Sequence, residues 1–257
     1  MTPSAAYDEV ADWYEEVFLR RNPPDSGTPG GDPIGIDRAL VDLLGRGSGA
    51  CLEIGCGTGI HAARIRGLGW APVGVDLSAG MLRHAGGRLP VARADAERLP
   101  IRDGSVSAVT AVMVHTDMPG YPAVLREVSR VLRPGGFVQF SVAHPATSTP
   151  VRRWVSDESG NRQALAIGDY FFQGPVTETW SFRTAPSRLR ARHRPFTITY
   201  ARRTLAGWLT AVLAAGLTIE AIAEPHADEA TAKVHPQVAD TRIAPYFLTV
   251  RARKPAR

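Results

Sequence analysis

Residues 50–59 combine a short apolar run with one acid and with three glycines at alternate positions, Gly55, Gly57 and Gly59. A strand that ends in such a turn lets a ligand lie against bare backbone, because glycine has no Cβ and can take a positive φ. Glu53 lies inside the apolar run, where a carboxylate is costly to bury unless it is paired or hydrogen-bonded. The pattern predicts a ligand site at the end of this strand, and Glu53 is its more unusual feature.

Two more acids come at the ends of predicted strands. Asp76 ends the run at 72–76, at the edge of a sheet where a carboxylate can accept both hydroxyls of a ribose. Asp95 follows a third short strand. An NAD site also places an acid near the position of Asp76. The glycine spacing differs, however, because in a dinucleotide fingerprint the last glycine comes three residues after the second.

Three segments resemble class I S-adenosylmethionine (SAM) methyltransferases, in particular the small-molecule, methyltransferase type 11-like group. Leu52–Gly59 resembles the family's hh(D/E)hGxGxG motif, Asp95–Pro100 its D-A-x-x-L-P segment, and Glu127–Gly136 its E-x-x-R-V-L-x-P-G-G signature. They occur in the family's order within residues 48–142. The resemblance implies a methyltransferase with SAM as cofactor, S-adenosylhomocysteine as product and no metal.

The same resemblance implies roles for individual residues. The glycine turn lies under the methionine moiety, where Glu53 orients the backbone, and Asp76 holds the ribose. Asp95 and Ala96 bind the adenine. The full set of implied cofactor-binding residues is Tyr7, Tyr14, Glu53, Gly55, Cys56, Gly57, Thr58, Gly59, Asp76, Leu77, Ser78, Met81, Asp95, Ala96, Ala111 and His115.

Residues 5–20 alternate apolar and acidic positions at helical spacing, which predicts an amphipathic helix. Tyr7 and Tyr14 are seven residues apart and therefore share one face of it. In related methyltransferases such a helix closes over the SAM pocket, so the resemblance implies that Tyr7 reaches the methionine end. Tyr14 has two interpretations, a second lid residue or a side chain that packs the helix onto the core.

Three histidines are candidate catalytic bases, because imidazole has a pKa near neutrality. His115 follows the predicted strand 107–114 and His144 follows the strand 136–142, so both fall at the carboxyl edge of the sheet. His193 is the third candidate. The alternative for His115 is a cofactor or loop contact, and for His144 it is a loop anchor bonded to the backbone.

Strands alternate with helices through the middle of the chain, which predicts an α/β class, Rossmann-like, doubly wound sheet of seven mostly parallel strands. The expected single domain has an N-terminal helical lid (1–47), a SAM-binding core (48–142), a substrate-facing insertion (143–203) and a C-terminal part (204–257). The predicted strands are 50–54, 72–76, 91–94, 107–114, 136–142, 217–223 and 246–252. The predicted helices are 37–44, 60–68, 78–88, 120–132 and 204–215, the last with Thr204 as N-cap and Gly216 as C-cap.

Residues 145–200 break this alternation with repeated prolines, aromatic residues and arginines. A structureless segment of this length in a compact domain is uncommon unless it is functional, and we expect short strands near 176–183 and 196–200. Its aromatic residues favour an apolar or planar acceptor under a lid. The arginines at 188–194, with Asp169 and Glu178, either recognise polar groups of the acceptor or form a solvated face.

The composition argues against several other classes. The net charge of +5 at pH 7 comes from arginine, since lysine occurs only at 233 and 254, which indicates a compositional bias more than a nucleic-acid surface. No apolar run reaches the roughly 20 residues of a membrane span. The acidic N-terminus does not resemble a signal peptide. We expect a cytoplasmic protein without membrane or nucleic-acid partners, and the oligomeric state stays open.

The leading functional prediction is methyl transfer from SAM to a small molecule, with secondary metabolites among the acceptors. A tRNA or rRNA methyltransferase is the alternative, favoured by an added RNA-binding domain or by an (N/D)-P-P-(Y/F) motif where this chain has residues 114–117, Val-His-Thr-Asp. A SAM-binding protein without catalysis would have the same cofactor motifs. An NAD oxidoreductase is disfavoured by the Asp95 segment.

Overall fold

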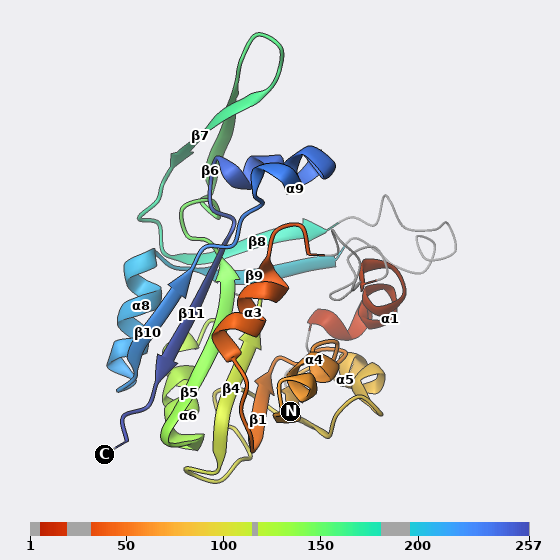
Figure 1. Ribbon diagram of the computed structural model, residues 1–257, viewed down its shortest axis with the longest axis vertical. Coiled ribbons are helices and arrows are strands. Elements are labelled where there is room, and N and C mark those ends of the chain that lie inside the picture. The colour runs from red at the N-terminus through yellow and green to blue at the C-terminus, as the bar shows by residue number, and fades with distance from the viewer. Residues whose placement is uncertain (1–5, 20–31, 115–117, 181–195, 257) are drawn as a thin grey trace.

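A seven-stranded sheet in the order β10-β11-β5-β4-β1-β2-β3 forms the centre of the computed structural model, which describes residues 6–19, 32–114, 118–180 and 196–256. The pairs β1–β2, β1–β4, β2–β3 and β4–β5 are parallel. β11 is antiparallel to both of its neighbours, β5 and β10. The sheet strands are β1 (Ala50–Ile54), β2 (Ala71–Asp76), β3 (Val91–Arg93), β4 (Val106–Val112), β5 (Leu132–Ala143), β10 (Thr218–Ala223) and β11 (Phe247–Arg253). The predicted fold class is confirmed (Figure 1).

Helices cover both faces of the sheet, and alternate residues of β1 serve the two sides. Cys51 packs with Leu40 and Ile65 of α3 and α4, whereas Leu52 belongs to the larger core under α6 and α8. Because both faces are buried, the central strands are apolar throughout. The helices are α3 (Ile36–Leu44), α4 (Ala62–Gly67), α5 (Ala79–Ala85), α6 (Tyr121–Val131) and α8 (Leu205–Ala214).

Most element boundaries agree with the sequence predictions to within a few residues. Thr204 caps α8 as predicted, accepting a hydrogen bond from the Gly207 N–H at 3.0 Å. The C-cap is Ala215 and not Gly216, which follows it with φ +76°. β5 is the exception because it begins at Leu132, four residues early. Leu132 already pairs with Val106 before a bulge shifts the register of β4 and β5.

The N-terminal segment is helical as predicted but irregular. It consists of a 3₁₀ turn (η1, Ala6–Glu9), one turn of α-helix (α1, Ala11–Trp13) and a π-helical turn (η2, Tyr14–Phe18). It lies beside α5, at the edge of the sheet near β2 and β3 (Figure 1).

The insertion contains two antiparallel hairpins. The predicted strands appear as β8 (Gly174–Trp180) and β9 (Phe196–Arg202). The sequence prediction missed the hairpin of β6 (Val151–Ser156) and β7 (Arg162–Gly168), which projects from the body of the molecule (Figure 1). It also missed α9 (Glu229–Val234) and the 3₁₀ segment η4 (Pro236–Arg242) before β11. Across the described residues, no helix has the length and apolar character to cross a membrane.

Arg202, at the end of β9, ties together the loops of the insertion. Its side chain is buried, and its guanidinium donates to the carbonyls of Pro145, Ser148, Tyr170 and Phe172 at 2.9–3.1 Å. Burial lowers the pKa of Arg202, against the attraction of nearby Tyr170. One guanidinium therefore supplies hydrogen-bond donors to the backbone carbonyls of two loops that are not part of a sheet.

Replacing Arg202 with methionine keeps most of the side-chain volume but leaves these buried carbonyls without their donors. We expect Arg202→Met to lower the free energy of unfolding by about 2–4 kcal/mol, measured by urea denaturation. Arg153→Met, on the exposed part of β6, is the matched control and should change it by less than about 0.5 kcal/mol. Equal effects of the two variants would show that Arg202 does not hold the insertion.

Candidate functional site

A cavity of about 470 Å³ opens at the carboxyl ends of β1, β2, β3 and β4. This is the edge at which ligands bind in open α/β sheets, and the volume suits a small molecule. The N-terminal segment and β9 contribute the cover. The lining residues are Tyr7, Tyr14, Ile54, Gly55, Gly57, Val75, Asp76, Leu77, Ser78, Met81, Ala94, Asp95, Ala96, Glu97, Val112, Met113, Val114, Met118, Pro119, Val124, Ile198 and Thr199.

The glycine turn after β1 brings bare backbone to this cavity. Gly57 has φ +53°, and a Cβ built there meets no atom within 4 Å, so a side chain would occupy open space at the cavity. Gly55 has φ +64°, and its Cβ would come within 2.2 Å of Val114 Cγ2. Gly57 therefore keeps space for a ligand, whereas Gly55 lets the end of β4 approach the turn.

Asp76 connects this turn to the end of β2. Its two carboxylate oxygens accept hydrogen bonds from the Gly57 N–H and the Ser78 N–H, each at 2.8 Å. Burial raises the pKa of Asp76 by more than these two bonds lower it, so the net shift is upward. An ionised carboxylate can accept about four hydrogen bonds, so Asp76 keeps capacity to accept from hydroxyl groups of a ligand.

Glu53 lies beneath the site and not in its lining. Its side chain is 1% exposed, and among the described residues its Oε2 atom has no hydrogen-bond partner. Burial, with the charge of Asp76 adding to it, raises the pKa of Glu53 to about 8. At neutral pH the carboxyl group is therefore largely protonated in the absence of a ligand.

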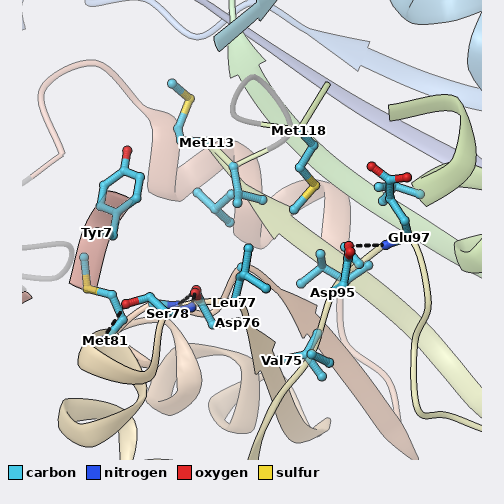
Figure 2. Close-up of a pocket in the computed structure, with 18 of the residues that line it drawn as sticks. Tyr7, Val75, Asp76, Leu77, Ser78, Met81, Asp95, Glu97, Met113 and Met118 are labelled. Carbon is cyan, nitrogen blue, oxygen red and sulfur yellow. Dashed lines mark hydrogen bonds between the residues drawn. The ribbon is translucent and has the colours of Figure 1, made fainter. Parts of the chain in front are cut away.

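The opposite wall of the cavity is apolar and was only partly foreseen. Met113 follows β4 with φ +56°, a left-handed conformation that is unusual for a non-glycine residue. Its N–H donates to the Ser141 carbonyl at 3.0 Å, which holds the strained residue against β5. Figure 2 shows Met113 and Met118 above Asp76 and Leu77, with Tyr7 to one side and Glu97 to the other. Met113 and Val114 could have been predicted, because ligands of open α/β sheets bind at the carboxyl ends of the strands. Ile198 and Thr199 could not, because they come from a hairpin that is far away in the sequence.

The structure brings together most of the predicted cofactor residues. Tyr7, Tyr14, Gly55, Gly57, Asp76, Leu77, Ser78, Met81, Asp95 and Ala96 all line the cavity. Cys56, Thr58 and Ala111 have buried side chains outside the lining, and a Cβ on Gly59 would lie 2.5 Å from Leu89. His115 and His193 lie outside the described residues. So do the arginines at 188–194.

His144 lies apart from the cavity lining, at the end of β5. Its side chain is 5% exposed, its Nδ1 accepts a hydrogen bond from the Ala146 N–H at 3.1 Å, and its Nε2 lies 2.9 Å from Glu224 Oε1. Burial lowers the pKa of His144, although Glu224 opposes the shift. With both ring nitrogens so placed, His144 fits the loop-anchor interpretation better than that of a base.

Tyr170, Phe171 and Phe172 of the insertion also lie outside the cavity lining. Tyr170 accepts a hydrogen bond from the Leu205 N–H at 3.0 Å, so it contacts the start of α8. Phe171 is 83% exposed, and neither it nor Phe172 lines the cavity. Among the described residues of the insertion, Ile198 and Thr199 in the middle of β9 line the cavity.

Comparisons with known proteins agree with this geometry. A family model described as a methyltransferase domain matches residues 52–140. A crystal structure of a SAM-dependent methyltransferase from Mesorhizobium loti superposes with a TM-score of 0.67 and 25% identity, covering 84% of this chain and 95% of that one. Residues 52–140 thus match the methyltransferase domain family, and most of the chain shares the fold of a SAM-dependent methyltransferase. These comparisons indicate SAM as the cofactor.

Curated relatives are also methyltransferases. A phthiotriol/phenolphthiotriol dimycocerosates methyltransferase from Mycobacterium leprae is 31% identical over 180 residues, 65% of this chain and 63% of the relative. A demethylmenaquinone methyltransferase from Mycolicibacterium vanbaalenii is 38% identical over 86 residues, 33% of this chain and 38% of the relative. The chain thus spans less than two thirds of the length of these two relatives.

The residues that line the cavity fit SAM. Gly57 leaves room where a Cβ would intrude, and Asp76 keeps acceptor capacity for ribose hydroxyls. The acidic side chains Asp76, Asp95 and Glu97 suit a ligand that carries sulfonium and ammonium cations.

Gly57→Val would place a branched side chain in the cavity and strain the backbone at positive φ. We expect SAM affinity to fall by more than about 100-fold in calorimetric titration, the loss of about 3 kcal/mol. Gly160→Val is the matched control, because Gly160 has φ +84° and open space around its Cβ at the distant tip of the β6–β7 hairpin. Unchanged affinity of Gly57→Val would contradict the position assigned to the cofactor.

Glu53 should make stability depend on pH. Its pKa of about 8 in the fold exceeds the unfolded value of 4.5, so the folded state binds the proton more tightly between these values. The stabilisation that protonated Glu53 contributes to the free energy of unfolding is fully present below about pH 4.5 and is lost as the pH rises through about 8. We expect Glu53→Gln to flatten this fall in the free energy of unfolding, measured by urea denaturation from pH 5 to about 8.5. The exposed Glu158→Gln control should keep the parental slope, and an equal slope in Glu53→Gln would contradict the burial argument.

Proposed function

We propose that this chain transfers the methyl group of SAM to a neutral or cationic small molecule with an apolar contact surface. The single observation that carries the proposal is the composition of the cavity. One side presents Asp76 and the glycine turn, and the other presents Met113, Met118 and Ile198. A cofactor and an acceptor can therefore share one cavity.

When bound, SAM supplies an electrophilic methyl group on a sulfonium centre. The residues of the chain bind and orient: Asp76 accepts the ribose hydroxyls, Asp95 and Ala96 face the adenine, and Tyr7 covers the methionine end. Met113, Val114 and Ile198 exclude water from the space beside the cofactor. Positioning of this kind provides much of the rate of a two-substrate displacement.

The charge of the cavity supports a small acceptor over a nucleic acid. Among the described residues that line it, the charged side chains are Asp76, Asp95 and Glu97, and none is basic. Nucleic acids are held largely through their phosphates by Lys and Arg. Methionine side chains are flexible and suit varied apolar shapes. The curated relatives named above methylate phthiotriol-type lipids and demethylmenaquinone, as their names state, and support the same class.

The acceptor class can be tested with methyl-labelled SAM and a panel of acceptors: phenols and quinols, apolar amines, carboxylic acids and bulk tRNA. We expect labelled product from members of the first two groups. Labelling of tRNA alone would contradict the proposal. Binding of SAM without transfer to any member would favour the non-catalytic alternative.

The ribose role of Asp76 has its own test. Asp76→Ala should weaken SAM by about 1–3 kcal/mol, which is about 5- to 150-fold in the dissociation constant, because hydrogen bonds to a charged group are lost. Asp42→Ala, on the exposed face of α3, is the control and should bind SAM normally. A loss below twofold for Asp76→Ala would refute the ribose role.

A further inference from the structure

The N-terminal segment meets α5 through a row of acidic side chains. Asp12 Oδ1 lies 2.9 Å from His84 Nε2, and Glu15 pairs with Arg88. Arg88 also donates to the Thr58 carbonyl at 2.8 Å, in the glycine turn. These outer contacts are exposed or half-exposed, where ion pairs contribute little to stability. At the inner end of the row, Asp8 binds Ser78, which lines the cavity, and the backbone of Gly80.

Asp8 contacts the residues that follow Asp76 along the chain. Its Oδ1 accepts hydrogen bonds from the Ser78 hydroxyl at 2.7 Å and from the Gly80 N–H at 2.8 Å. Ser78 also donates its N–H to Asp76 at 2.8 Å, and its hydroxyl oxygen accepts from the Met81 N–H. Hydrogen bonds to a carboxylate are stronger than neutral ones, so Asp8 binds the N-terminal segment firmly to the element that carries the ribose site.

The backbone at this point approaches too closely for any residue but glycine. A Cβ on Gly80 would lie 2.9 Å from the Asp8 carbonyl oxygen, 3.0 Å from Asp8 Cα and 3.1 Å from Ala11 Cβ. Gly80 is buried within α5 and does not have a positive φ. Its lack of a side chain therefore serves the contact with the N-terminal segment and not the conformation of α5 itself.

Tyr7 precedes Asp8 and lines the cavity together with Tyr14. The two rings form an edge-to-face pair with centroids 6.4 Å apart. Figure 2 shows Tyr7 above Met81 and Ser78, on the side of the cavity opposite Asp95 and Glu97. The position of its ring is therefore tied to the hydrogen bonds that its neighbour makes.

We propose that Asp8 is a positioning residue that holds Tyr7 over the cofactor through the Ser78 hydroxyl and the Gly80 N–H. The inference rests on the proposed function, because Tyr7 matters only if the cavity holds SAM. Asp8 touches neither cofactor nor acceptor in this scheme. It acts through Tyr7, and the closeness of Asp8 to Asp76 also explains why the Asp8 charge adds to the raised pKa of Asp76.

The first test compares Asp8→Asn with Glu9→Gln. Both variants remove one negative charge, but Glu9 is exposed and lies beside the contact, so it is the matched control. We expect Asp8→Asn to raise the dissociation constant for S-adenosylhomocysteine about tenfold, with an unchanged melting temperature, because charge-assisted bonds are replaced by weaker neutral ones. Glu9→Gln should bind normally. Tight binding by Asp8→Asn would overturn the proposal.

The second test uses Gly80→Ala, which favours helix formation in α5 but pushes the N-terminal segment away. We expect weaker binding of S-adenosylhomocysteine without loss of thermal stability. A double-mutant cycle then separates positioning from a general structural role: Tyr7→Ala should weaken binding in the parent chain and have almost no further effect in Asp8→Asn. Additive effects would overturn the positioning role. If the unmodified chain bound neither SAM nor S-adenosylhomocysteine, the proposed function itself would fail before any variant was compared.

Discussion

The carboxylate of Asp76 is the constraint on which the rest of the site depends. It accepts the Gly57 N–H from the turn after β1 and the Ser78 N–H from the start of α5, so it fixes two neighbouring strand ends relative to each other. A half-buried acid in this place is stabilised by those donors and keeps acceptor capacity toward the cavity. Gly57, with its positive φ, and the buried Glu53 beneath it belong to the same cofactor-binding edge.

Two parts of the chain that are far apart in sequence complete the site. The N-terminal segment places Tyr7 at one side, through Asp8, and β9 places Ile198 and Thr199 at another. The residues after β9 continue this role: Arg203 donates to the Pro119 carbonyl at 2.6 Å and stacks on Tyr121 and Trp208. Arg203 thus links the end of the insertion to the loop before α6 and to α8.

Much of this architecture could be predicted from the sequence because it depends on local signals. Glycines after apolar runs, acids at strand ends and the Thr204 cap all act within a few residues. The β6–β7 hairpin was missed because Val151–Ser156 has adjacent arginines and no clean alternation with period two. The contacts of Asp8 with Ser78 and Gly80 span about 70 residues, and no local pattern announces them. The same holds for Ile198 in the cavity wall.

The central claim is that the edge formed by β1 and β2 binds the cofactor through Asp76. A crystal structure of the chain with S-adenosylhomocysteine tests it most directly. We expect both ribose hydroxyls within hydrogen-bonding distance of the Asp76 carboxylate, the methionine moiety against Gly57, and Tyr7 over that end of the ligand. A ligand bound elsewhere, or a ribose turned away from Asp76, would contradict the account.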